Sequence, residues 1–162
     1  LVNSSKECYV SGLAILGVKD SKIYNCYVTG NIKQISNGTG NVNCSGISTF
    51  NLGEIESCYN LAEITGEIND STLSGGCYVG GIVVNQQGNS IVNCYNNGNL
   101  IAKGSGSAFN LGGIARIIVG VDTKIEKSYN AGKLTLEVVN GKNNAVVGRN
   151  CCGSRPWRIN CK

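Results

Sequence analysis

The chain has 162 residues, enough for one domain with a core, and only 15% of them are charged, well below the usual share of about 25%. Residues 1–148 balance ten basic against ten acidic side chains, so the net charge of +4 comes from the last fourteen residues. We expect this basic end to be solvated and not a nucleic-acid site. No run of eighteen apolar residues occurs, which excludes a membrane-spanning helix.

One short phrase recurs five times along the chain. Cys-Tyr occurs at 8–9, 26–27, 58–59 and 94–95, and Ser-Tyr takes its place at 128–129. In the fuller copies an isoleucine precedes the tyrosine by four residues, and a glycine follows it by three in most copies. Recurrence of this kind is typical of repeat architectures, in which each unit buries its apolar face against the next.

A second phrase alternates with the first. Gly46-Ile47, Gly81-Ile82 and Gly113-Ile114 lie between successive tyrosine copies. The steps between the tyrosines at 27, 59, 95 and 129 are similar in length, and each is close to twice the step from 9 to 27. We therefore interpret each long step as two repeat units of about 16–18 residues.

The apolar stretches between the glycines favour strands over helices. They are short and rich in β-branched residues, as at 82–84, 114–119 and 134–139, and the many glycines and asparagines suit tight turns. The sequence predicts an all-β fold, a right-handed parallel β-helix (β-solenoid) of about nine coils of about 16–18 residues. We expect residues 1–148 to form the repeat domain and residues 149–162 to form an irregular Cys/Arg-rich cap or tail.

The phrases Ile91 to Leu100 and Tyr78 to Val83 resemble the GLUG-type repeats of bacterial surface proteins, which alternate an "I-x-N-C/S-Y-N-x-G-x-I" phrase with a "G-G-I-V-G" phrase. The resemblance covers about residues 20–148, and Ala62 departs from it by replacing a phrase glycine. It implies a β-solenoid in a large secreted or cell-surface protein, a class that includes adhesins. It supplies no catalytic residue and no cofactor.

Six cysteines recur near the expected coil period, and the first three are evenly spaced. We expect them to form one structural column, with a cysteine in each coil: Cys8, Cys26, Cys44, Cys58, Cys77 and Cys94. Ser128 occupies the same slot, which favours small, buried, unpaired thiols. Disulfides between neighbouring coils and a metal site are the alternatives, although the chain has no histidine to serve as a ligand.

Three further cysteines lie in the basic tail, at 151, 152 and 161. A disulfide between Cys152 and Cys161 is the pairing that we expect to close a cap over the open end of the solenoid, with Cys151 as the alternative partner. A zinc site with three thiolates is the other possibility for these residues.

The tyrosines of the repeat, with the asparagines that follow them, are the other candidate sites. Tyr27, Tyr59, Tyr95 and Tyr129 would recur in about every second coil and either bind sugar rings or a partner protein, or only stiffen the stack. Asn60, Asn96 and Asn130 would form an amide ladder, each bonding to the next coil.

Catalysis has little support in the sequence. The one acidic cluster comprises Glu54, Glu56, Glu63 and Glu67, and we interpret it as a solvated face. Within it, Glu54 and Glu56 would share a strand face and pair with Arg116 or Lys127 if the coils aligned. We therefore predict no catalytic residue, no metal and no cofactor.

The function that the sequence predicts is a non-catalytic repeat module of a secreted or cell-surface protein, an adhesin stalk or binding scaffold. Its expected partner is a glycan or protein of a host or neighbouring cell, with no nucleic acid and no membrane span. A self-assembling filament or surface-layer subunit, joined through the solenoid ends, is the main alternative. A carbohydrate-active enzyme and an ice-binding face are weaker ones.

Overall fold

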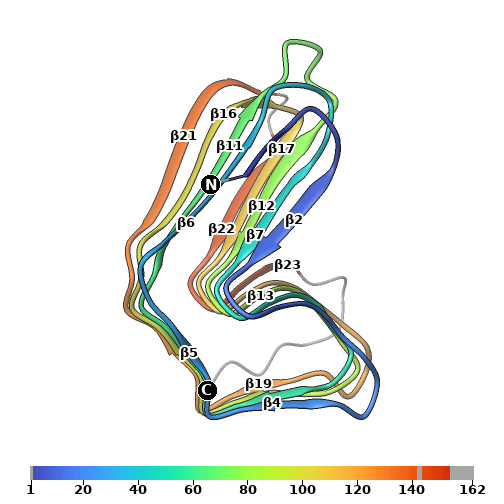
Figure 1. Cartoon of the computed structure of the whole chain (residues 1–162), viewed down its shortest axis with the longest axis vertical. Coiled ribbons are helices and arrows are strands. Elements are labelled where there is room, and N and C mark those ends of the chain that lie inside the picture. Colours follow the sequence, from blue (N-terminus) through green and yellow to red (C-terminus); the bar gives the residue numbers. More distant parts are fainter. Residues whose placement is uncertain (1, 142–143, 154–162) are drawn as a thin grey trace.

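A computed structural model describes residues 2–141 and 144–153, and every regular element in this part of the chain is a β-strand. The strands form five parallel sheets, which we name A to E in the order in which one coil visits them. After the strand in sheet E, the chain returns to sheet A and lies beside the strand from which it started (Figure 1). The prediction of an all-β, parallel β-solenoid is therefore confirmed.

Sheets A, B and C each hold five strands, and sheets D and E hold four. Sheet A contains β1 (Val2–Ser4), β6 (Asn31–Ser36), β11 (Glu63–Asn69), β16 (Leu100–Gly106) and β21 (Leu134–Gly141). Sheet B contains β2 (Cys8–Ser11), β7 (Val42–Ser45), β12 (Gly76–Gly80), β17 (Ala108–Gly112) and β22 (Ala145–Gly148). Sheet C contains β3 (Ala14–Gly17), β8 (Ser48–Asn51), β13 (Val83–Gln87), β18 (Ala115–Val119) and β23 (Cys151–Gly153).

The two remaining sheets are made of very short strands. Sheet D contains β4 (Lys22–Tyr24), β9 (Glu54–Glu56), β14 (Ile91–Val92) and β19 (Ile125–Glu126). Sheet E contains β5 (Tyr27–Val28), β10 (Tyr59–Asn60), β15 (Tyr95–Asn96) and β20 (Tyr129–Asn130).

One coil is twice as long as the sequence predicted. Tyr27 pairs with Tyr59, Tyr59 with Tyr95, and Tyr95 with Tyr129, so each coil spans the whole step from one of these tyrosines to the next. The prediction of about nine short coils is therefore wrong, and the described chain makes a little over four turns. The reason is that the two alternating phrases are two different corners of one coil, not two successive coils.

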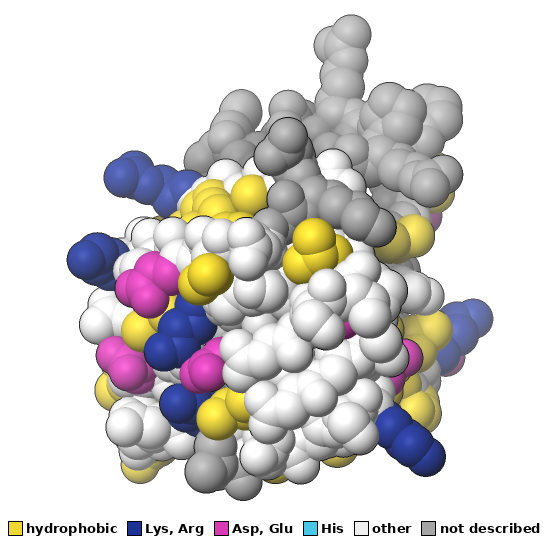
Figure 2. Space-filling view, turned by 90° about the horizontal axis from the view of Figure 1, so that it is seen from above, with side chains coloured by type: hydrophobic (Ala, Val, Ile, Leu, Met, Phe, Trp, Pro, Cys, Tyr) yellow, Lys and Arg dark blue, Asp and Glu magenta, His cyan; other side chains and the backbone are white. Residues whose placement is uncertain are grey.

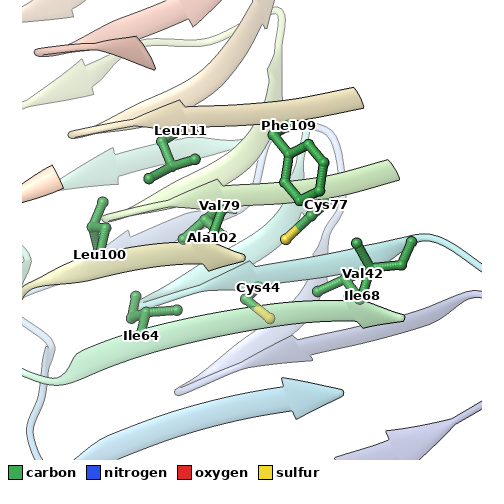
Figure 3. Close-up of a cluster of buried hydrophobic side chains, with 10 residues drawn as sticks. All are labelled: Val42, Cys44, Ile64, Ile68, Cys77, Val79, Leu100, Ala102, Phe109 and Leu111. Atoms are coloured by element: carbon green, nitrogen blue, oxygen red, sulfur yellow. The ribbon is translucent and has the colours of Figure 1, made fainter. Parts of the chain in front are cut away.

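The first core lies between sheets A and B. Side chains alternate along the strands, and in β16 every second residue, beginning with Leu100, is buried. Leu100 and Ile64 of sheet A meet Val79 and Phe109 of sheet B in one buried cluster (Figure 3). Complete burial of such a side chain contributes roughly 1.5–3 kcal/mol to stability, so each added coil extends a continuous stabilising core.

The second core lies between sheets C, D and E, in the lower lobe of Figure 1. Ile55, Ile91 and Ile125 of sheet D pack there against Ile82 and Ile114, which come from the Gly-Ile phrase between sheets B and C. The isoleucine before each tyrosine and the isoleucine of the second phrase therefore meet inside the same coil.

The glycine of the second phrase is required by the close stacking of the coils. A Cβ atom built on Gly81 would collide with the carbonyl oxygen of Gly113 in the next coil and would lie 2.7 Å from the side-chain Cγ of Asn96. Any larger residue would force neighbouring coils apart at this corner, which explains why glycine recurs there.

Sheet C continues past residue 148, the boundary predicted for the repeat domain, because β23 pairs in parallel with β18. None of the described residues belongs to a helix long and apolar enough to cross a membrane.

Candidate functional site

The four repeat tyrosines form one continuous ladder along sheet E. Their rings stack with centroids 5.1, 4.8 and 5.5 Å apart and with planes within 9° of parallel. The ladder includes Tyr27, Tyr59, Tyr95 and Tyr129. A tyrosine therefore occurs in every coil, and the expectation of one in every second coil is corrected, because the coil itself is longer.

Stacking hides most of the aromatic faces. The inner rings of Tyr59 and Tyr95 each have a neighbouring ring on both sides, so they present edges and hydroxyl groups to solvent. Tyr27 and Tyr129, at the two ends, are 61% and 54% exposed. Burial, followed by the neighbouring phenols of Tyr59 and Tyr129, raises the pKa of Tyr95. A sugar stacks on an aromatic face, so the ladder offers faces for this contact only at its two ends.

The asparagines after the tyrosines form a buried amide ladder. Asn60 Nδ2 donates to Asn96 Oδ1 at 2.6 Å, and Asn96 Nδ2 donates to Asn130 Oδ1 at 2.6 Å. Each Nδ2 also donates to the backbone carbonyl two residues later, at Ala62, Gly98 and Gly132. These amides hold neighbouring coils together, and the first coil has Val28 in the same row.

The cysteines do not form the single column that the sequence predicted. Cys26, Cys58 and Cys94 do lie in one row, directly before the ladder tyrosines, and Ser128 continues it. Cys26 N donates to Cys58 Sγ at 3.4 Å, and Cys94 N donates to Ser128 Oγ at 3.0 Å. This row lies at the corner between sheets D and E.

The other three cysteines belong to sheet B and divide between two rows. Cys8 and Cys77 both pair with Val42, whereas Cys44 pairs with Val10 and Val79. Cys8 and Cys44 are separated by about the length of one coil, but Cys8 pairs with Val42, so Cys44 lies two residues further along β7 and in the next inward-facing row.

All six of these cysteines are unpaired thiols in the structure. Burial raises the pKa of Cys77 to about 12. Contact with the Cys94 thiol lowers the pKa of Cys58, and the same contact raises the pKa of Cys94. Each thiol of this pair also bonds to a backbone carbonyl two residues earlier, at 3.2 Å. Among the described residues, no group of three Cys, Asp or Glu side chains converges as metal ligands would.

The acidic cluster pairs with lysines other than those considered from the sequence. Lys22 contacts both Glu54, at 3.7 Å, and Glu56 across sheet D, in place of Arg116 or Lys127. Glu67 lies between Lys33 and Lys103 on the outer face of sheet A, at 3.4 and 3.7 Å. These ion pairs connect neighbouring coils, and they are partly exposed, so each adds little stability.

The long turn between β11 and β12, residues 70–75, is organised by one buried carboxylate. We call this segment the pinned loop. Asp70 Oδ1 accepts from Thr72 N at 2.8 Å, and Asp70 Oδ2 accepts from Ser74 N and Gly75 N, both at 2.7 Å. Hydroxyls of Thr72 and Ser74 add two more bonds. The hydrogen bond from Gly75 N contributes most, and that from the Thr72 side chain next, to holding the pKa of Asp70 well below its usual range.

The pinned loop is also bonded to the following coil. Asp70 N donates to the carbonyl of Ser105 at 3.0 Å, and Ser107 N donates to the carbonyl of Gly75 at 2.7 Å. In Figure 1 it is the green loop that projects beyond the other turns at the top of the molecule. The loop is therefore both prominent and firmly held.

A groove of about 500 Å³ lies beside the pinned loop, and we call it the loop groove. Its lining comes from three successive coils: Asn69, Ser71, Leu73, Ser105 and Asn140. None of these five side chains carries a charge. Figure 2 looks onto this end of the molecule, where uncharged side chains and backbone dominate and charged side chains gather toward the side of sheet A.

The sequence interpretation did not identify the loop groove. Two signals pointed to it: the step from Tyr59 to Tyr95 is the longest of the series, and residues 70–76 are almost all turn formers. What the sequence could not give was the alignment of Ser105 and Asn140 with this turn, because that depends on the coil length and on a bulge between β16 and β21.

The outer faces of sheets B and C meet at a second group of polar and aromatic side chains. Tyr78 lies here, in a row apart from the ladder, and the Arg116 guanidinium lies 4.2 Å from its ring centroid. Tyr9 and Phe50 make an edge-to-face contact two coils earlier, with centroids 5.2 Å apart. These contacts close the corner between the two sheets.

The predicted cap disulfide between Cys152 and Cys161 lies outside the residues whose side chains the structure describes, and so does the alternative zinc site of the tail. Comparison with protein-family models, with curated proteins and with solved structures finds no match to this chain. The stacked parallel coils are established by the structure alone, and membership of the GLUG-type family stays a hypothesis.

Proposed function

We propose that this chain is a non-catalytic repeat module of a secreted or cell-surface protein, acting as an adhesin stalk or binding scaffold, as the GLUG-type resemblance implies. One observation carries the proposal: within the part of the chain that the structure describes, a regular body of stacked coils presents one prominent loop that is pinned from within by Asp70. Loops held by a rigid scaffold are where binding residues concentrate.

The use of the acidic residues also supports a non-catalytic role. Hydrolases on parallel β-helices need clustered carboxylates that are available to a substrate. Here Glu54, Glu56 and Glu67 are engaged in ion pairs with lysines of neighbouring coils, and Asp70 is engaged by its own loop.

Binding to arrayed glycans and to intact animal or bacterial cells tests the proposal. We expect the labelled protein to bind at least one glycan or cell type in a saturable manner. Thermally unfolded protein serves as the control for non-specific adsorption. A flat response on every surface would contradict a binding role and leave only that of a spacer.

Self-assembly through the solenoid ends is a second candidate that a specific observation favours. The first coil exposes four apolar side chains, Leu13, Ile15, Leu16 and Val18, each more than half accessible. Unpaired strand edges and apolar ends promote end-to-end association. Size-exclusion chromatography over a concentration series tests it, and a monomer at high micromolar concentration would eliminate this candidate.

A further inference from the structure

We propose that the loop groove is a binding site for a neutral saccharide. This inference rests on the proposed binding function and deepens it, since it names both the site and the chemical class of the ligand. The residues that would contact the sugar are Asn69, Ser71, Leu73, Ser105 and Asn140.

The chemistry of the lining residues suits a sugar. Two amides and two hydroxyls supply both donors and acceptors, which is what the hydroxyl groups of a sugar require. Leu73 adds an apolar surface for the C–H groups of the ring. A charged ligand would find no opposite charge among the described lining residues, whereas a neutral polyhydroxylated ligand can use their polar groups.

The rigidity of the site also favours ligand binding. The Asp70 carboxylate accepts backbone bonds from Thr72, Ser74 and Gly75, and the loop is bonded again to Ser105 and Ser107 of the next coil. A loop that is already ordered loses little conformational entropy when a ligand binds, so a shallow polar site gains affinity from this arrangement.

Two local irregularities of the backbone meet at the groove, as is common beside binding sites. Leu73 has a left-handed backbone with φ of 54°, which is strained for a residue with a large side chain. On the opposite wall, the pairing of β16 with β21 shifts register after Gly104, so that Ser105 lies opposite Asn140 and Val139 is left out. Bulges of this kind re-aim side chains and occur frequently beside binding sites.

The size of the groove is compatible with the ligand. Its volume of about 500 Å³ falls within the range of roughly 300–1,000 Å³ that is typical of small-molecule sites. The lining comes from β11 with the pinned loop, from β16 and from β21, so the groove runs across three coils and suits an elongated sugar better than a single small ion.

Backbone amide NMR spectra test the inference directly. Glucose, galactose, mannose and N-acetylglucosamine, with oligosaccharides built from them, would be titrated to high millimolar concentration, with glucuronate as the charged comparison. We expect at least one neutral sugar to shift the amides of residues 71–74 and 105, and glucuronate to bind more weakly than its neutral counterpart glucose.

The blocking variant is Ser105→Tyr, because the Ser105 side chain lines the groove and the tyrosine ring would fill it. Thr135→Tyr, on the same sheet but outside the groove, is the matched control. We expect Ser105→Tyr to weaken sugar binding by at least about tenfold and Thr135→Tyr to leave it unchanged, with the ladder resonances intact in both.

Two results would overturn the inference, and they differ in what they say of the proposed function. If a sugar binds but shifts other residues and survives Ser105→Tyr, the site is wrong and the binding scaffold stands. If no neutral sugar binds while arrays or cells still capture the protein, the ligand class is wrong. Failure of the array and cell assays as well would remove the proposed function itself.

Discussion

Each coil has a corner between sheets D and E, the first corner, and a turn between sheets A and B, the second corner. The first keeps its length in every described coil, whereas the second varies. At the first corner every described coil repeats one conformation: Asn25, Ser57, Asn93 and Lys127 all have a left-handed φ between 48° and 54°, followed by Cys or Ser and then Tyr. At the second, the turn has three, five, six and one residues in successive coils, at 5–7, 37–41, 70–75 and 107.

The difference between the corners shows which contacts fix the length of a turn. At the first corner, rings and amides from each coil interlock with those of the next, so a change of length in one coil would break contacts in two others. At the second, the row of side chains formed by Asn3, Asn37 and Asn69 is exposed, so the bonds that it makes between coils do not fix the length of the turn. Turn length therefore varies at the second corner, where the groove lies, and also between sheets C and D, but not at the first corner.

Removing one amide from the middle of the buried ladder should have the largest effect on stability. Asn96→Ala should lower the free energy of unfolding by about 3 kcal/mol, since Asn60 and Asn130 lose partners in a buried site. Chemical denaturation measures the change.

The matched control is Asn37→Ala, in an exposed row of amides. Asn37 Nδ2 donates to Asn3 Oδ1 and Asn37 Oδ1 accepts from Asn69 Nδ2, both at 3.0 Å, but water can replace these bonds. We expect a loss of less than about 0.5 kcal/mol. Equal losses for the two variants would contradict the view that interlocking inside the stack fixes the first corner.

Removing the charge of Asp70 from the pinned loop should lower the thermal stability by an intermediate amount, and this loss should depend on pH. The folded pKa of Asp70 is depressed, so its ionised form stabilises the folded state above the unfolded pKa of about 4, and this stabilisation is lost as the pH falls toward the folded value. Asp70→Asn should therefore unfold at a lower temperature than wild type at neutral pH, and the gap should narrow below about pH 4.

Amide hydrogen exchange locates this effect. Ser74 and Gly75 should lose protection in Asp70→Asn, while the amides of the tyrosine ladder keep theirs. Asp122→Asn, at an exposed carboxylate, is the control. A gap between wild type and Asp70→Asn that does not vary with pH would show that the carboxylate does not organise the loop by its charge.

Shortening the pinned loop should have the smallest effect on stability. Replacing residues 70–75 by one serine reproduces the turn that Ser107 makes in the next coil. Loop closure depends only weakly on length, so we expect a change of less than about 1 kcal/mol, together with loss of the loop groove. Thermal unfolding measures the first and sugar titration the second; a failure to fold would show that this turn is as constrained as the other corner.

The sequence was sufficient for the parallel solenoid and for its aromatic and amide rows, because Tyr59, Tyr95 and the asparagines after them keep their spacing to within a few residues. It was not sufficient for the coil length. The regular spacing of the glycine-bounded strands fits one short coil or half of a long one equally well, and only the pairing of Tyr27 with Tyr59 distinguishes them.

The sequence was also not sufficient to show which residues of different coils share a row. Cys8 and Cys44 are separated by about the length of one coil, yet they lie in adjacent inward-facing rows because Cys8 pairs with Val42, two residues before Cys44. The loop groove could not be predicted either, because Ser105 pairs with Asn69 in regular register but meets Asn140 only through a shift that no local pattern encodes.

The buried amides also give the stack a direction. From Asn60 to Asn96 to Asn130, each side chain donates toward the later coil and none toward the earlier one. The three dipoles are therefore aligned along the solenoid axis with their positive ends toward the last coil, and each polarises the next. An added coil that carried asparagine in this row would meet the amide of Asn130 after the last coil but the apolar side chain of Val28 before the first, so growth at the two ends is chemically distinct.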